Sequence, residues 1–255
     1  MAPDDPQRRL RFRFTKHGKI RFTSHRDVAR MWERALRRSH LPVALSQGYN
    51  PHPLVSFGLA LPTGCESLGE YLDIRLDPVQ SGEPSLDHLT DLLTDLLPEG
   101  IEVQVAAVIP MTEGSLQQEI ASCDWQLEVF DVTSEVLAGQ VERLLAASSL
   151  TVQRERKGRP VEDDIRPAIL ALAVDPEPGE STGHYPQGRL STRLATHPRG
   201  VRPSDLVAAL GTEMVLARAC RTHQWIERDG ATFEPLPVSE LGTGPVVTHA
   251  HGRAS

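Results

Sequence analysis

Hydrophobic and polar positions along the chain switch between a period of two and a period of three to four. Residues 9–16 place Leu10, Phe12 and Phe14 at alternate positions with arginines between them, which is typical of a strand with one apolar and one basic face. Residues 25–38 instead repeat their apolar side chains at helical spacing. Ser24, with Asp27 three residues later, is typical of the capped start of that helix.

The same switching continues through the first half of the chain. It predicts strands at residues 43–45, 54–61, 70–76 and 101–108, and a helix over residues 85–97 with Ser85 and Asp87 at its start. Residues 111–123 are polar and predict a connecting turn or short helix. The order strand, helix, strand, strand, helix, strand is the ferredoxin-like split βαβ plan.

The second half has a similar order of predicted strands and helices, but its residues do not repeat those of the first half. Strands are predicted at 125–132, 150–156, 169–174, 189–196 and 214–220, helices at 134–147 and 203–210, and a polar loop at 175–188. We therefore expect an α+β protein of two tandem ferredoxin-like (βαββαβ) halves, with antiparallel sheets that carry helices on one face. The expected domains are residues 8–110 and 124–235, followed by a disordered tail over residues 236–255.

Composition narrows the class of protein. The 255 residues are 39% hydrophobic and 24% charged, which is typical of a globular chain. No apolar run reaches the roughly 20 residues of a membrane span, and the first residues lack an apolar signal-peptide core, which predicts a cytoplasmic location. Cys65, Cys123 and Cys220 lie far apart, so we expect no metal site and no cluster held by this chain alone. Neither a P-loop nor a GxGxxG motif occurs, so no nucleotide or dinucleotide cofactor is indicated.

The net charge of −7 conceals an uneven distribution. Residues 8–38 hold twelve Arg and Lys against two acids, a local charge of +10, so the rest of the chain carries −17. Residues 39–142 contain a single basic residue, Arg75. Such a concentrated basic segment attracts phosphate backbones. The alternative is a basic face that pairs with the protein's own acidic surface or with a partner protein.

The candidate binding residues lie on the predicted helix and on the loop that follows it. The arginines of the helix suit phosphate contacts, and they are Arg26, Arg30, Arg34, Arg37 and Arg38. In the loop, two prolines around one histidine stiffen the backbone. Its side chains that can contact bases or backbone are Gln47, Tyr49, Asn50 and His52. The structural alternative is a turn in which the polar side chains satisfy local backbone groups.

His25 opens an enzymatic alternative. A histidine at a helix start can act as a general base beside Arg26 as a phosphate clamp, with Tyr49 or His52 assisting. The structural alternative is ordinary capping by Ser24 and Asp27, with His25 packed or solvated.

A second basic cluster is expected at a hairpin tip. It consists of Arg154, Arg156, Lys157 and Arg159. It is either another contact with a nucleic-acid backbone or a solvated turn.

Four motifs in residues 22–74 resemble a known family. They are Ser-His-x-Asp at 24–27, Glu-Arg-Ala-Leu-Arg-Arg at 33–38, Gln-Gly-Tyr-Asn-Pro-His-Pro-x-x-Ser-Phe at 47–57 and Gly-x-Glu-Ser-x-x-Glu-Tyr-x-Asp at 64–73. These motifs are similar to those of the uncharacterised radical-SAM-linked proteins, also called domain of unknown function 2344. Many residues match the family over residues 9–76. Beyond them the resemblance rests only on chain length and on the order of predicted elements. Arg26 stands where the family often has an apolar residue.

The resemblance implies a partner. Members are encoded beside, or fused to, a radical S-adenosylmethionine protein, which implies that the iron–sulfur cluster and S-adenosylmethionine are bound by that partner. The two-half layout also resembles RNA-cleaving CRISPR repeat-processing proteins, a likeness of fold alone. We therefore expect an accessory protein without its own cofactor that binds RNA, such as tRNA or rRNA, for modification by the radical enzyme. The alternatives are a metal-independent ribonuclease with His25 as general base, and a protein-only scaffold for the radical enzyme.

Overall fold

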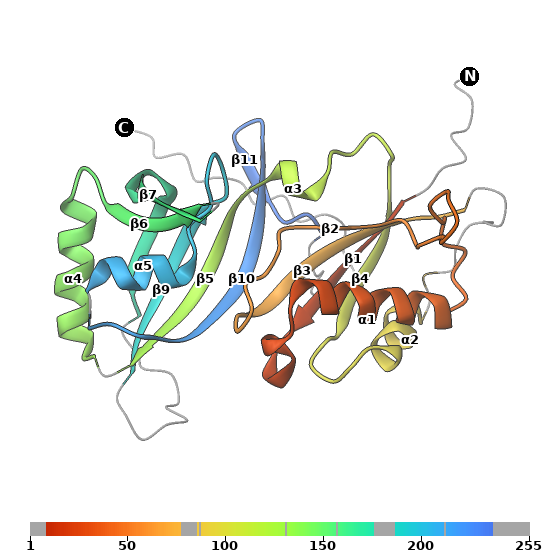
Figure 1. The fold of residues 1–255 in the computed structure, drawn as a ribbon, viewed down its shortest axis with the longest axis horizontal. Coiled ribbons are helices and arrows are strands. Elements are labelled where there is room, and N and C mark those ends of the chain that lie inside the picture. The colour runs from red at the N-terminus through yellow and green to blue at the C-terminus, as the bar shows by residue number, and fades with distance from the viewer. Residues whose placement is uncertain are drawn as a thin grey trace. The chain divides into compact units, whose positions relative to one another are not determined.

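The computed structural model describes residues 9–77, 86, 88–130, 132–156, 158–175, 187–211 and 213–236. Over these residues the chain is a mixed α/β protein with five α-helices and a large, mostly antiparallel sheet (Figure 1). It forms two compact units. The first contains the described residues up to Ile120 and those from Gln224 onward, and the second contains residues 121–223.

The first unit is built from strands and helices in alternation. In chain order they are β1 (Arg9–Lys16), the short 3-10 helix η1 (Gly18–Phe22), α1 (His25–Arg38), β2 (Val55–Phe57), β3 (Glu66–Arg75), α2 (Leu89–Leu96), β4 (Val103–Ile109) and α3 (Leu116–Glu119). β1 pairs antiparallel with β3 and with β4, and β2 pairs antiparallel with β3. The strand order is therefore β4-β1-β3-β2.

The period-two pattern of β1 divides its side chains between two environments. Phe12 and Phe14 face the helices, where the Trp32 ring of α1 lies 5.8 Å from Phe12 and 5.1 Å from Phe14 between centroids. Leu89 and Leu93 of α2 belong to the same buried core. Both helices therefore cover one face of this sheet, and the arginines of β1 point to the other.

The second unit has the same order of strands and helices, with one additional hairpin. In chain order it contains β5 (Ile120–Phe130), α4 (Ser134–Ala146), β6 (Thr151–Arg156), β7 (Arg159–Asp164), the 3-10 helix η2 (Arg166–Ala168), β8 (Ile169–Val174), β9 (Gln187–Ala195), α5 (Pro203–Leu210) and β10 (Leu216–Arg228). β9 pairs antiparallel with β5 and β8, and β10 lies beside β5, so the order is β10-β5-β9-β8. β6 and β7 form a separate two-stranded sheet. The end of β10 belongs to the first unit, where it pairs with β11 (Ala231–Phe233).

Most predicted elements are confirmed to within a few residues, and β1, α1, β8 and α5 have the predicted bounds. The strand predicted at residues 43–45 is wrong, because this stretch makes only the isolated bridges Val43↔Leu76 and Leu45↔Pro53. The strand predicted over 54–61 shrinks to the three residues of β2. Pro53, two residues before β2, has no N–H to extend the ladder in that direction.

Two strands were missed, and some predictions cannot be compared. β7 carries the sequence RPVEDD, in which Val161 is the only aliphatic side chain besides a proline, so no hydrophobic alternation marks it. β11 is only three residues long. The helix start at Ser85 and Asp87, most of the loop at 175–188 and the tail from residue 237 lie outside the described residues. Residues 224–235 were expected in the second half, whereas they belong to the first unit.

No helix in the part of the chain that the structure describes is long and apolar enough to cross a membrane.

Candidate nucleic-acid interface

The arginines of β1 form ion pairs inside the protein. Arg11 is 1% exposed and donates from Nε and Nη2 to the two oxygens of Asp73 at 2.8 and 3.1 Å. Arg13 contacts Glu234 at 2.8 Å, and Arg9 lies 3.5 Å from Asp73. Buried charges need such partners, because an unpaired ion loses its hydration without compensation. This part of the basic segment is thus an internal charge match.

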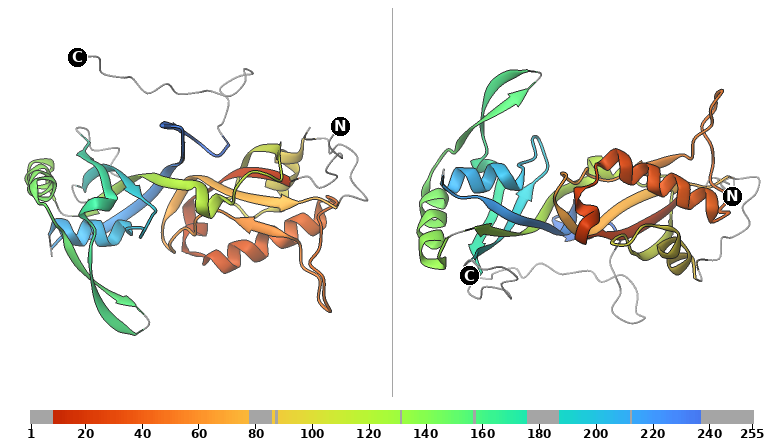
Figure 2. Two further views of the ribbon diagram at one scale, coloured as in Figure 1. Left: turned by 90° about the horizontal axis from the view of Figure 1, so that it is seen from above. Right: turned by 60° about the horizontal axis from the view of Figure 1, so that its bottom comes forward.

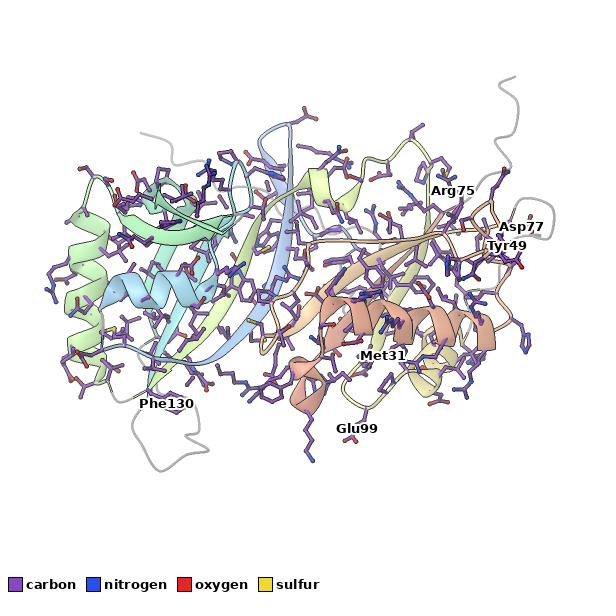
Figure 3. All side chains as sticks on the ribbon, in the orientation of Figure 1. Met31, Tyr49, Arg75, Asp77, Glu99 and Phe130 are labelled. Carbon is purple, nitrogen blue, oxygen red and sulfur yellow. The ribbon has the colours of Figure 1, made fainter. Side chains whose placement is uncertain are left out.

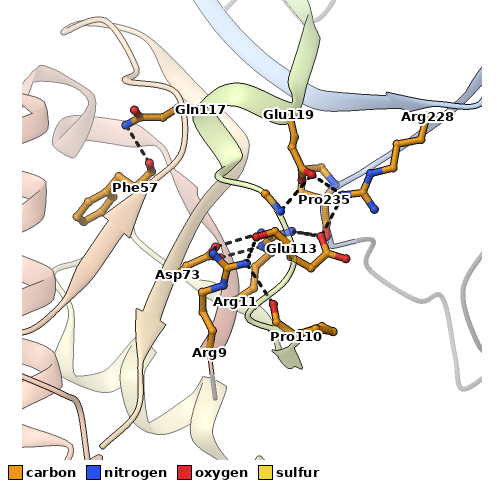
Figure 4. A network of polar contacts seen from close by, with 11 residues as sticks. Arg9, Arg11, Phe57, Asp73, Pro110, Glu113, Gln117, Glu119, Arg228 and Pro235 are labelled. Carbon is orange, nitrogen blue, oxygen red and sulfur yellow. Dashed lines mark hydrogen bonds and ion pairs between the residues drawn. The ribbon is translucent and has the colours of Figure 1, made fainter. Parts of the chain in front are cut away.

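The same network fastens the C-terminal strand to the first unit (Figure 4). Arg228 at the end of β10 lies 3.1 Å from Glu113 and 2.8 Å from Glu119. The hydrogen bond from Arg228 is the largest cause that lowers the pKa of Glu113 below its ordinary value. Arg11 also donates to the carbonyl of Pro235 at 3.4 Å.

Tyr71 adds a contact to the residues that follow β11. Its hydroxyl donates to Glu234 at 3.4 Å, and burial is the main cause that raises the pKa of the phenol far above its ordinary value. The phenol therefore stays protonated and remains a donor.

Two further cations of the segment are also held by the protein. Arg21 lies 3.2 Å from the buried carboxylate of Glu66. The Lys16 amine, which is 2% exposed, donates to the carbonyls of Arg21 and Thr23 at 3.3 and 3.0 Å.

The helix α1 presents the remaining arginines to solvent. Val28, Trp32, Ala35 and Leu36 turn its apolar face into the core. The other faces carry five exposed arginines, namely Arg26, Arg30, Arg34, Arg37 and Arg38, which we call the basic ridge.

The contacts of the basic ridge are local and weak. Arg30 lies 3.5 Å from Asp27, and both side chains are about half exposed. Arg34 donates to the carbonyl of Arg30 at 3.2 Å. Ion pairs of this kind add little to stability, so the guanidinium groups can exchange them for phosphates at small cost.

The start of α1 is a capped helix end. Ser24 accepts a hydrogen bond from the Asp27 N–H at 3.2 Å and donates from its hydroxyl to the Asp27 carboxylate at 2.7 Å. The hydrogen bond from Ser24 is the largest cause that lowers the pKa of Asp27. His25 is exposed, with its ring edge-on to Phe57 at 5.1 Å between centroids.

Residues 43–54 form an arm that projects from the first unit (Figure 2). Its two sides are joined by the hydrogen bond from the Ser46 N–H to the His52 carbonyl, at 2.8 Å, and by that from the His52 N–H to the Ser46 hydroxyl, at 3.0 Å. Gly48 turns the chain with a φ of 137°, which side chains rarely allow. The predicted contact residues of the arm are all exposed, and they are Gln47, Tyr49, Asn50 and His52.

The arm lies at the C-terminal end of α1 and beside the end of β3. Arg37 reaches the carbonyl of Pro51 at 3.5 Å. The Ala44 N–H donates to the carbonyl of Arg75 at 2.8 Å, and Tyr49 is seen at the same end of the unit as Arg75 (Figure 3). Tyr49 has the full exposure of a free side chain. The structure thus groups the C-terminal part of the basic ridge with the arm.

His25 is at the opposite end of that helix. From His25 to Arg37, which touches the arm, α1 rises about 18 Å at roughly 1.5 Å per residue. The two regions are therefore distinct, and the structure does not bring His25 together with Tyr49 and His52.

The family model for "Uncharacterized protein conserved in bacteria (DUF2344)" matches residues 9–202. The chain belongs to this family. The match includes the basic ridge and the arm, and it also includes most of the second unit. No curated protein matches the chain.

The motifs that resemble this DUF2344 family meet in a place that was not expected. Lys16, His25, Phe57 and Glu70 line a small hollow beside the start of α1, which has room for about one water molecule. Lys16 and Glu70 were not candidates from the sequence, although Glu70 belongs to the fourth motif. The hollow is too small for a nucleotide.

No cluster of three or more His, Cys, Asp or Glu residues suited to a metal ion occurs within the described ranges.

Proposed function

We propose that this protein binds RNA through the basic ridge of α1 and the arm. The proposal rests on the difference between the two parts of the basic segment, residues 8–38. The arginines of β1 are neutralised by Asp73 and Glu234, whereas those of α1 stay exposed beside an exposed tyrosine.

The chemistry of the two parts is complementary. The basic ridge offers guanidinium groups to phosphates, and this term supplies most of the affinity in salt-dependent binding. Tyr49 offers a planar face on which an unpaired base can stack, worth about 1–3 kcal/mol per base. Gln47 and Asn50 beside it offer amide donors and acceptors for base edges. Unpaired bases are accessible in RNA loops, so we propose a structured RNA such as tRNA or rRNA.

We further propose that the bound RNA is presented to a radical S-adenosylmethionine enzyme in the cytoplasm. That partner would supply the iron–sulfur cluster and S-adenosylmethionine, and the chain described here would act as an accessory protein rather than as the enzyme. This part of the proposal rests on the family resemblance of the four motifs.

We also interpret both units as ferredoxin-like halves. The strand order β4-β1-β3-β2 in the first unit and β10-β5-β9-β8 in the second supports this interpretation, because each has a βαββαβ order around a central antiparallel pair. The β6–β7 hairpin would then be an insertion in the second half.

The test compares one arginine of the basic ridge with a matched arginine elsewhere. Arg34→Glu should weaken binding to a fluorescent RNA stem–loop and reduce the salt slope by about one unit, because one phosphate contact is lost. Arg143→Glu is the control, since Arg143 is exposed on α4 and donates to the carbonyl of Gly139 as Arg34 does to Arg30. Tyr49→Ala should weaken binding without changing the unfolding midpoint, because its side chain is fully exposed.

The proposal fails if the wild-type chain binds RNA no better than an acidic control protein of similar net charge. Equal losses in Arg34→Glu and Arg143→Glu would also remove the basic ridge as the binding surface. Retention of a radical enzyme in high salt and without RNA would instead support a protein-only scaffold.

A further inference from the structure

An exposed phenylalanine, Phe22, lies at the end of α1 opposite the arm. It is the last residue of η1, the short red turn directly before α1 in Figure 1, and it is 63% exposed. Among the exposed large hydrophobic residues that the structure describes, Tyr49 alone exceeds this value. The two most exposed of these side chains therefore lie at the two ends of one helix, within one unit.

Buried and local hydrogen bonds hold the backbone around Phe22. The Lys16 ammonium, which is 2% exposed, donates to the carbonyls of Arg21 and Thr23, the residues on either side of Phe22. The N–H and the hydroxyl of Thr23 both donate to the Ile20 carbonyl, at 3.0 and 2.7 Å. A side chain on a backbone that is already fixed loses little further freedom when a ligand binds to it.

One face of the Phe22 ring is covered by Arg21. The guanidinium carbon lies 4.8 Å from the ring centroid, and the same guanidinium donates to the Glu66 carboxylate at 3.2 Å. Glu66 is 2% exposed, so the charge of Arg21 is matched inside the protein and its cation supports the ring. The exposure of Phe22 therefore belongs to the other ring face and to the ring edges, where a base can stack.

A row of arginines joins Phe22 to the arm. Arg26, Arg30, Arg34 and Arg38 follow one another at four-residue intervals, which places them on one i+4 ridge of the helix surface, and all four are exposed. The row rises about 18 Å at roughly 1.5 Å per residue. Phe22 is within about 14 Å of Arg26 between Cα atoms, because four residues cannot span more. The cations thus form a line between two exposed aromatic rings.

We propose that Phe22 is a second stacking platform and that the RNA crosses α1 as a single strand. Unpaired bases stack on Phe22 and on Tyr49, and the phosphates between them follow the row of arginines. The inference rests on the proposed function for the identity of the ligand and adds the form of RNA that binds. Paired bases remain stacked inside a duplex and reach neither ring. At about 3.4 Å per nucleotide of a stacked strand, the row alone corresponds to about five unpaired nucleotides.

The experiment measures binding of a fluorescent single-stranded RNA of about eight nucleotides by the full chain over a series of salt concentrations. Phe22→Ala should raise the Kd about 5- to 150-fold, which corresponds to the loss of one base stack, and should leave the salt slope unchanged because no charge is lost. Phe22→Trp should bind like the wild type, because an aromatic ring remains. Phe130→Ala is the matched control, since it removes another exposed phenylalanine, and it should leave the Kd unchanged.

The form of the RNA gives a second readout. The same RNA annealed to its complement should bind the wild-type chain more weakly than the single strand does. Phe22→Ala should not change the Kd of this duplex, because its bases do not reach the ring. A duplex that binds as tightly as the single strand would overturn the inference.

The outcomes separate this inference from the proposed function. If the wild-type chain binds neither form of RNA, both fail. If Arg34→Glu and Tyr49→Ala weaken binding of the single strand and Phe22→Ala does not, the inference is overturned and the proposed function stands. Equal losses in Phe22→Ala and Phe130→Ala would also overturn it, and so would a loss of binding in Phe22→Trp, because stacking on the ring would then not explain the effect.

Discussion

Arg11 and Arg34 show how neighbours decide what one residue type does. Arg11 lies on a strand whose partner places Asp73 directly opposite, and both side chains are buried. Removing either partner would leave an uncompensated buried charge, so the pair is a structural unit. Arg34 lies on the outer face of a helix and, among the described residues, its side chain donates a hydrogen bond to a carbonyl of its own helix. Its charge remains available to a ligand.

Glu113 gives a pH-dependent test at the residue scale. Its pKa is lowered in the folded protein, so its contribution to stability is present above the unfolded value of about 4.3 and is lost as the pH falls through the folded value. Glu113→Gln should lower the urea midpoint at neutral pH and make the decline on acidification shallower. Glu99→Gln, at an exposed carboxylate, is the control. An unchanged acid limb in Glu113→Gln would show that the Arg228 contact does not contribute.

At the scale of elements, the two longest helices begin with the same device. Ser24 accepts a hydrogen bond from the Asp27 N–H at 3.2 Å, and Thr133 accepts one from the Val136 N–H at 3.4 Å. In both helices the cap side chain accepts a hydrogen bond from an N–H of the first turn, where the backbone offers no i−4 carbonyl within the helix. Capping and the apolar stripe are local in sequence, which is why α1 and α4 were predicted to within one residue.

The two caps predict graded losses of stability. Ser24→Ala should lower the free energy of unfolding by about 1 kcal/mol, because it removes the cap and the hydrogen bond to the Asp27 carboxylate. Thr133→Ala should cost less, about 0.5 kcal/mol, because its hydrogen bond is longer. Urea unfolding of both variants measures the difference. The reverse order would show that hydrogen-bond length does not rank these caps.

At the scale of the whole molecule, the last described residues, from Gln224 onward, return to the first unit. Gln224 is fully buried and donates to the carbonyl of Gly69 at 2.6 Å, and Glu234 holds Arg13. Residues more than 150 positions apart in the sequence therefore complete the unit. This return segment, residues 224–236, follows the second unit in the sequence but is grouped with the first unit in the structure.

This return predicts that the first unit needs both parts of the chain. A fragment of residues 1–120 should unfold at a lower urea concentration than the first unit in the full chain, because Arg13 and the Gly69 carbonyl lose their partners. Fluorescence of Trp32 measures the fragment, and a Trp125→Phe, Trp225→Phe version of the full chain gives the reference. Joining residues 224–236 to the fragment through a flexible linker should restore the midpoint. An unchanged midpoint in the bare fragment would contradict this account.

The sequence names the separate groups of the candidate site, and the structure shows which of them lie close together. The arginines of α1 and the side chains of the arm are candidates from the sequence alone, since helix spacing and prolines act over a few residues, and in the structure they are exposed. The sequence does not show that the arginines of β1 are paired inside the protein, because their partners Asp73 and Glu234 come from 62 and 221 positions away. The hollow lined by Lys16 and Glu70 was missed for the same reason.

The sequence by itself determined most of the elements and their order, the faces of β1 and α1, and the uneven charge, because each depends on local periodicity and composition. Only the tertiary structure decided which positive charges remain exposed, that His25 is a helix length away from the arm, and that the last strands complete the first unit. Those outcomes depend on pairing between distant segments, and pairing is set by the burial of a shared core and by the need of each buried charge for a partner.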